Sequence, residues 1–141
     1  MLEKFCTGSM YIVIPFCIPL IFFPKLDYTQ TIAKNIYILI ISLSMIYIYL
    51  LFNFSNIILD NISFPLSVEK LRLALSYSEI SLLIWFLLLI GNVFTTQWIF
   101  FYSMKRNYNC FITSLIIIIT LILGHPVGII LQTLRQIFMK F

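Results

Sequence analysis

Charged residues are scarce in this chain of 141 residues. Lysine, arginine, aspartate and glutamate make up only 10% of the sequence, whereas hydrophobic residues make up 62%. The mean hydropathy is +1.06. A water-soluble domain of this size needs far more polar side chains to cover its surface. The scarcity of charge therefore excludes an ordinary soluble domain and indicates an integral membrane protein.

The groups that usually carry enzyme chemistry are also few. The chain has one histidine and five acidic residues, and none of the acidic residues lies in a long apolar stretch. Zinc-protease, nucleophile-elbow, phosphate-loop and dinucleotide-binding motifs are all absent. Cys6, Cys17 and Cys110 lack the CxxC spacing of metal or redox sites. The sequence therefore predicts no catalytic residue, no metal site and no cofactor. Whether the chain is an enzyme stays open, with a non-catalytic role favoured.

Four stretches of the chain contain no charged side chain. Each has about 20 residues or more, the length that crosses ~30 Å of hydrocarbon at ~1.5 Å per residue. We therefore predict an all-α fold, an integral membrane bundle of four transmembrane helices forming one domain over residues 1–141. The expected spans are 5–23, 36–54, 79–102 and 110–134, with a polar connection at residues 25–35. We therefore expect a multi-pass protein of a bacterial inner membrane or an organellar membrane, with membrane lipid as its partner.

The long connection between the second and third spans contains an amphipathic segment. Four apolar residues share one helical face there: Phe64, Val68, Leu71 and Leu75. We expect a short interfacial helix over residues 64–75, between spans two and three. Ser76 and Glu79 have the spacing of a capping box, which predicts the start of span three.

Nine basic residues give the chain a net charge of +4. They occur singly or in pairs at the ends of apolar stretches, as headgroup anchors do, and so they do not indicate a nucleic-acid partner. In a four-span topology, one side of the membrane carries five of these basic residues: Lys4, Lys70, Arg72, Arg135 and Lys140. The other side carries four: Lys25, Lys34, Lys105 and Arg106. That division is too even for the positive-inside rule to decide an orientation.

Polar residues inside the spans are the candidate ligand-binding residues, because polar groups at membrane depth usually turn inward. Asn92 and Thr96 lie four residues apart and share a helical face. They either line a ligand site or form hydrogen bonds between helices. Trp98 belongs either to an interfacial aromatic belt or to an aromatic wall for a polyene.

The segment from Gly124 to Gly128 contains two glycines, His125 and Pro126. This combination predicts a break or kink in the fourth span, and broken helices in membranes often mark binding sites. His125 is either a proton-active group or a neutral imidazole bonded to a carbonyl.

The order of these features resembles the abscisic-acid-deficient-four-like family of small membrane proteins. The resemblance covers most of the chain and rests on four pieces: Pro15-Phe16-Cys17, Pro24-Lys25-Leu26 with Thr29, residues 92–99, and Pro126-Val127-Gly128 with Arg135. The residues that match the family pattern are Phe94, Trp98, Pro126, Gly128 and Arg135. We expect Pro126, Gly128 and Arg135 to have structural roles. The plant member is required to make neoxanthin from violaxanthin, so the resemblance implies a hydrophobic, isoprenoid or carotenoid ligand.

The chain departs from that family pattern at four positions. Asn92 stands where the family has aspartate, Thr96 and Leu87 replace a glycine and a histidine, and His125 replaces a glycine before Pro126. We therefore predict a divergent member that is non-catalytic or accessory and binds a hydrophobic or isoprenoid-like ligand. The alternatives are an isomerase-like enzyme acting on a carotenoid or similar polyene, and a subunit of an oligomeric transporter. Homo-oligomerisation stays open.

Overall fold

The computed structural model describes residues 2–61 and 67–138. Within these residues the protein consists of helices without strands, as the all-α prediction requires. The helices are α1 (Leu2–Phe22), α2 (Asp27–Asn53), α3 (Ser55–Asn61), α4 (Val68–Ser76), α5 (Ser78–Lys105), α6 (Cys110–Leu123) and α7 (His125–Phe138).

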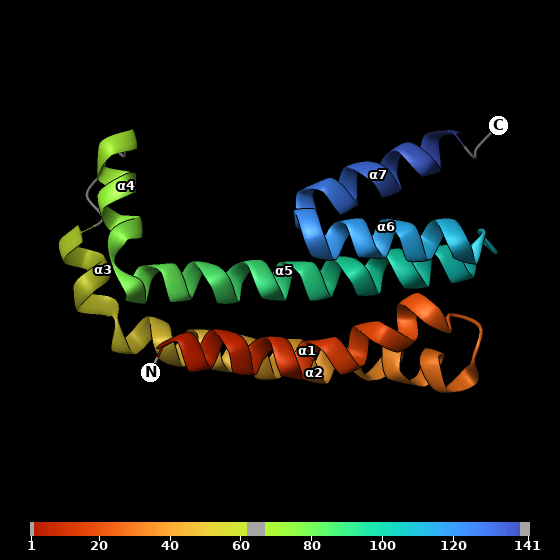
Figure 1. The fold of residues 1–141 in the computed structure, drawn as a ribbon, viewed down its shortest axis with the longest axis horizontal. Helices are drawn as coiled ribbons and strands as arrows, with labels where there is room; N and C mark the ends of the chain where they lie inside the picture. The colour runs from red at the N-terminus through yellow and green to blue at the C-terminus, as the bar shows by residue number, and fades with distance from the viewer. Residues whose placement is uncertain (1, 62–66, 139–141) are drawn as a thin grey trace.

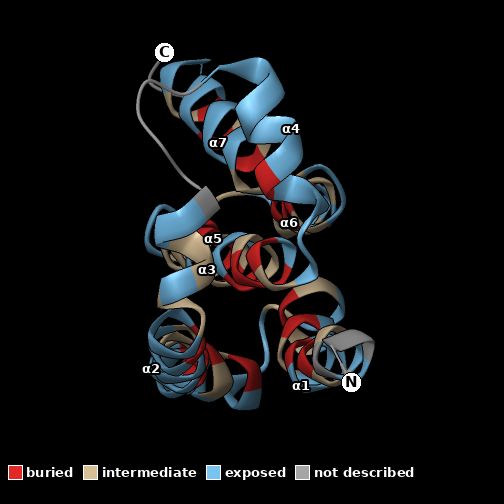
Figure 2. Ribbon diagram, turned by 90° about the vertical axis from the view of Figure 1, so that its left-hand side faces the viewer, coloured by how far each residue is buried: buried red, intermediate tan, exposed pale blue. Residues whose placement is uncertain are grey.

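Helix α5 is the central element of the bundle. Helices α1 and α2 run antiparallel along one side of it, and α6 and α7 lie on the other side (Figure 1). The end-on view in Figure 2 shows α5 surrounded by these neighbours, with buried residues on several of its faces. This central position explains why the apolar sequence of α5 is not confined to one stripe.

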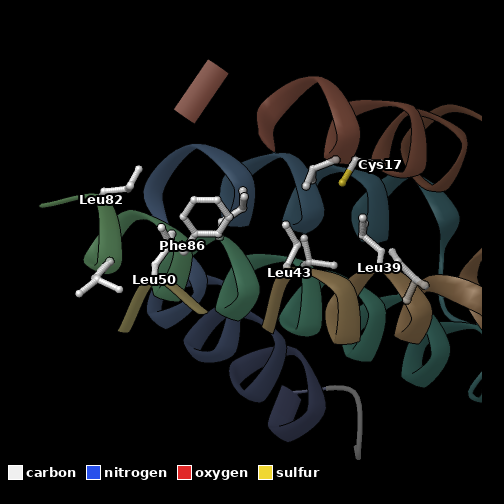
Figure 3. Close-up of a cluster of buried hydrophobic side chains, with 11 residues drawn as sticks. Cys17, Leu39, Leu43, Leu50, Leu82 and Phe86 are labelled. Atoms are coloured by element: carbon white, nitrogen blue, oxygen red, sulfur yellow. The ribbon is translucent and has the colours of Figure 1, made fainter. Parts of the chain in front are cut away.

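The apolar core between α1, α2 and α5 is formed by aliphatic side chains around Phe86, which is 1% exposed. Figure 3 shows this core, with Cys17, Leu39, Leu43, Leu50, Leu82 and Phe86 labelled. Two hydrogen bonds join α5 to its neighbours. Trp85 Nε1 donates to Ser9 Oγ of α1 (3.3 Å), and Gln97 Nε2 donates to the Ala33 carbonyl of α2 (3.0 Å). Close packing and a few interhelical hydrogen bonds hold helices together in lipid, where no hydrophobic force acts between them.

The outer surface of the bundle is apolar. Helix α2 alone exposes Ile38, Ile41, Met45, Ile48 and Phe52, each by 45% or more. Continuous apolar surface of this kind marks a membrane or protein contact. Among the described residues, α2 and α5 are long and apolar enough to cross a membrane, whereas the apolar helices Cys6–Phe22 and Cys110–Leu123 are shorter.

The predicted polar connection at residues 25–35 is wrong, because α2 already begins at Asp27. Asp27 lies in the first turn, where a carboxylate interacts favourably with the helix dipole. Thr31 Oγ1 donates to the Asp27 carbonyl at 3.0 Å, so a polar side chain is accommodated without interrupting the helix. Helix α2 therefore begins well before the predicted span at residues 36–54, and the link to α1 is only a few residues long.

The predicted break in the fourth span is confirmed, and it divides the segment at residues 110–134 between two helices, α6 and α7. Gly124 separates α6 from α7 and has φ of +96°, a conformation that favours glycine. Pro126 lacks an amide hydrogen, so the helical bond to the Ile122 carbonyl cannot form. Helix α7 then folds back along α6, and Arg135 Nη2 donates to the carbonyl of Asn109, which precedes α6 (3.1 Å; Figure 1).

A short helix between the second and third long helices was predicted, and α4 confirms it over Val68–Ser76. Phe64 of the predicted segment lies outside the described residues. Ser67 caps α4 by accepting from the Lys70 amide at 3.2 Å. The predicted capping box of Ser76 and Glu79 is wrong: Ser76 still belongs to α4 and donates to the Leu73 carbonyl, while α5 begins after Tyr77 without a side-chain cap.

Candidate functional site

Helix α7 buries its long polar side chains Gln132 and Arg135 and exposes apolar residues. Its buried residues are Gly128, Gln132 and Arg135, whereas Ile130 and Ile137 are exposed by 58% and 52%. This arrangement is the reverse of that in a water-soluble domain. It suits a helix that faces lipid on one side and the interior of a bundle on the other.

The two helices of the α6–α7 hairpin approach closely at Gly128 and Thr120. A Cβ added at Gly128 would overlap Thr120 Oγ1 and lie 2.6 Å from Thr120 Cγ2. Thr120 is fully buried and its hydroxyl donates to the Ile116 carbonyl at 2.7 Å. Only glycine at position 128 permits this approach, which places the turn of the hairpin against α5.

An apolar cavity of about 550 Å³ lies at this turn, between α1, α5 and the end of α6. Its wall is formed mostly by aliphatic, sulfur-containing and aromatic side chains from these helices: Met10, Val13, Ile14, Cys17, Trp85, Leu88, Leu89, Leu121, Ile122 and Leu123. Asn92, Gly124 and Pro126 complete the lining. A volume of this size lies in the range of small-molecule sites.

Asn92 contributes an amide to the lining of this cavity, with an acceptor oxygen and a donor nitrogen. Asn92 Oδ1 is buried and has no hydrogen-bond partner among the described residues. The Ile122 carbonyl belongs to a lining residue and cannot receive a helical bond from Pro126. A buried acceptor without a donor costs about 1–3 kcal/mol, so the cavity favours a ligand that carries a hydroxyl or another donor.

His125 packs next to the cavity, against α5. A Cβ added at Gly91 would lie 2.9 Å from His125 Nδ1, so the absence of a side chain at Gly91 makes room for the imidazole. His125 Nδ1 is buried without a hydrogen-bond partner in the described part of the chain. The hairpin therefore brings His125 to the helical turn that carries Asn92, which sequence spacing alone does not do.

The other two predicted ligand-binding residues lie away from the cavity lining. Thr96 is fully buried, and its Oγ1 has no hydrogen-bond partner among the residues described. Trp98 lies toward the α5–α6 turn, with its ring 6.1 Å from that of Tyr102, which is in turn 6.2 Å from the Tyr108 ring. These three rings thus form a short series near the helix ends, whereas Trp85 is the aromatic residue that lines the cavity among the residues described.

Arg135, predicted as a structural residue, joins all three C-terminal helices. Its Nη1 donates to Ser103 Oγ at 3.2 Å and to Thr113 Oγ1 at 3.0 Å. Its guanidinium lies over the Tyr108 ring, 4.4 Å from the centroid. These partners are all uncharged, and the sequence contains no acidic residue after Glu79. Pro126 and Gly128, the other predicted structural residues, form the hairpin turn and the close helix contact.

Sequence reasoning missed the contribution of α1 to the cavity. Met10, Val13 and Ile14 are ordinary apolar residues of a membrane helix, and nothing in their spacing distinguishes a cavity lining from a lipid-facing surface. Gln132 was missed as well, although it is fully buried and neither amide atom has a hydrogen-bond partner within the described residues. Its position seven residues after His125, on the same helical face, was the available signal.

Among the described residues no group of three or more histidine, cysteine, aspartate or glutamate side chains could hold a metal ion. A family model described as ABA DEFICIENT 4-like matches residues 5–131 of the chain. Comparisons with curated proteins and with solved structures give no match. The resemblance inferred from the sequence is therefore confirmed.

Proposed function

This chain belongs to the ABA DEFICIENT 4-like family, and we propose that it is a multi-pass membrane protein that binds a hydrophobic, isoprenoid-like ligand in the cavity between α1, α5 and the α6–α7 turn. The observation that carries the proposal is the unpartnered Asn92 Oδ1 in an apolar cavity of about 550 Å³. An elongated apolar molecule with a hydroxyl group would fill the cavity and supply the missing donor.

A carotenoid or similar polyene fits this chemistry, and an isomerase-like activity on it is the second candidate. His125 supports that candidate, because its unpartnered Nδ1 lies beside the cavity and an imidazole is a common general base. Binding alone is favoured because a proton transfer of this kind usually needs a second acid–base group, and no acidic side chain lies in α6 or α7.

For the topology, we propose three membrane-spanning helices, α1, α2 and α5, with α6 and α7 as a re-entrant hairpin. Each hairpin helix has 14 residues, which at ~1.5 Å per residue covers about two thirds of the hydrocarbon layer. The polar backbone at Gly124 is then enclosed by protein, as irregular backbone at membrane depth requires.

This topology changes how basic residues divide between the two ends of the bundle. Among the described residues, one end carries Lys25, Lys34, Lys105, Arg106 and Arg135 with Asp27 as its acidic residue. The other end carries Lys4, Lys70 and Arg72 together with Glu3, Asp60, Glu69 and Glu79. The positive-inside rule then places the α5–α6 turn in the cytoplasm, or in the equivalent compartment of an organelle.

Helix α4 is proposed to lie in the membrane interface. Its axis crosses that of α5 instead of continuing it (Figure 1), and Val68 and Leu71 are exposed by 84% and 48%. A nitroxide label at Leu71 should be relaxed mainly by dissolved oxygen, which concentrates in lipid, and a label at Glu69 on the opposite face mainly by an aqueous nickel chelate. Equal nickel accessibility at the two sites would contradict an interfacial position.

Asn92→Leu tests the proposed binding site. We expect a hydroxylated apolar molecule to co-purify with the wild-type protein and to be absent from Asn92→Leu, as measured by extraction and mass spectrometry. The free energy of unfolding should stay unchanged or rise by about 1 kcal/mol, because the substitution removes a buried acceptor that has no hydrogen-bond partner among the described residues. Asn53→Leu is the matched control, since Asn53 is exposed and bonds only its own helix. A ligand retained by Asn92→Leu would disprove the site.

A further inference from the structure

A second, amphiphilic site lies at the basic end of the bundle, separate from the apolar cavity. We propose that it binds an anionic phospholipid, with the phosphate held near Lys25 and part of an acyl chain held between α1 and α6. None of its lining residues lines the apolar cavity described above. The inference therefore does not depend on the proposed isoprenoid-like ligand.

The polar half of the site is a cavity of about 540 Å³ where the α1–α2 link meets the α5–α6 turn. Its lining consists of Lys25, Met104, Asn107, Tyr108, Asn109 and Cys110. Lys25 is exposed and supplies an ammonium group. The amide and phenol groups supply hydrogen-bond donors, so the lining matches the oxygens of a phosphate group.

Arg135 lies behind the lining of the polar cavity and adds to its positive charge. Its Nη2 donates to the Asn109 carbonyl at 3.1 Å, and its guanidinium stacks on Tyr108 at 4.4 Å, so it touches two of the lining residues. Arg135 is 7% exposed and its Nε has no hydrogen-bond partner in the described part of the chain. A desolvated cation that is bonded only to neutral oxygens attracts an anion strongly, and Asp27 is the one acidic residue at this end among the residues described.

The apolar half is an adjoining groove of about 330 Å³ between the end of α1 and the start of α6. It shares Cys110 with the polar cavity, and Pro24 of the groove precedes Lys25 of the cavity in the chain. Side chains along the groove include Ile21, Phe22, Phe111, Leu115 and Ile118. Ser114 Oγ donates to the Ile21 carbonyl at 2.6 Å and holds the two helices together.

A polar, basic cavity that continues into an apolar groove matches the two parts of a lipid molecule. A soluble phosphate would use only the first part, and an uncharged lipid only the second. The site also lies at the helix ends, which is the depth of the headgroups when α1 and α5 cross the bilayer. Charge and shape together therefore favour an anionic lipid as the occupant.

Native mass spectrometry of the detergent-solubilised protein tests this inference. Phosphatidylglycerol should bind the wild-type protein, and Lys25→Gln should weaken that binding about fivefold, as expected from ~1 kcal/mol per basic residue. Lys34→Gln, which makes the same charge change at an exposed position outside the cavity, should leave the affinity within about twofold. If Lys25→Gln and Lys34→Gln weakened phosphatidylglycerol binding equally, the proposed site would be wrong.

Two further probes test the two halves. Diacylglycerol with the same acyl chains and glycerol phosphate should each bind at least about tenfold more weakly than phosphatidylglycerol. If diacylglycerol bound as tightly as phosphatidylglycerol, the proposed role of the basic cavity would be wrong. If glycerol phosphate bound as tightly as phosphatidylglycerol, the site would be one for soluble phosphate instead. Retention of the isoprenoid-like ligand by Lys25→Gln would show that the two sites are independent, whereas its loss would overturn their separation.

Discussion

Replacing Gly128 with alanine should lower the free energy of unfolding by about 3 kcal/mol, the upper end of the range for overpacked positions. The new Cβ would overlap Thr120 Oγ1 and lie 2.8 Å from Thr120 Cβ, so rotation of the threonine side chain cannot make room for it. The backbones of α6 and α7 must separate instead. Unfolding in mixed detergent and SDS, followed by circular dichroism, measures the loss.

Gly8→Ala is the matched control for this prediction. Gly8 also lies inside a helix, so the gain in helix propensity from alanine applies equally, but a Cβ added there meets nothing within 4 Å. We expect no loss of stability from it. Thr120→Gly combined with Gly128→Ala should recover at least half of the lost free energy, measured against Thr120→Gly alone, because it removes all three threonine atoms that the new Cβ would meet. No recovery in this double variant would show that the close contact is not the cause.

Cysteine labelling should place residue 137 on the same side of the membrane as residue 107. In a variant without the three native cysteines, an impermeant maleimide added to sealed vesicles should react with Asn107→Cys and Ile137→Cys from one side. Ser76→Cys should react only from the other side. The expected difference is all or none, because the hairpin returns the C-terminal end of α7 to the α5–α6 turn.

A continuous fourth span gives the opposite result at one site. Ile137→Cys would then react together with Ser76→Cys, and that outcome would contradict the re-entrant hairpin. The same variants test the orientation, since intact cells should expose only Ser76→Cys to the reagent if the basic end is cytoplasmic. Permeabilised cells, in which all three sites should react, control for the reactivity of each cysteine.

The sequence predicted several features of the candidate site but not their arrangement. The glycines and proline at residues 124–128 indicated a broken helix, and the polar side chains of Asn92 and His125 stood out in apolar surroundings. A break permits either a kink or a reversal. The reversal depends on the contact of Gly128 with Thr120 and on the bonds of Arg135 to residues 22 to 32 positions away, which no local pattern reveals.

The sequence alone determined that this protein is helical and apolar, because low charge and long uncharged stretches are properties of composition and spacing. It also determined the family, since residue order carries that information. Only the tertiary structure decided which apolar residues line a cavity and at which end of the bundle Arg135 lies. Both depend on how helices pack across the chain: α1 meets Trp85 some 75 residues later, and α7 lies beside α6 because one glycine allows their backbones to approach.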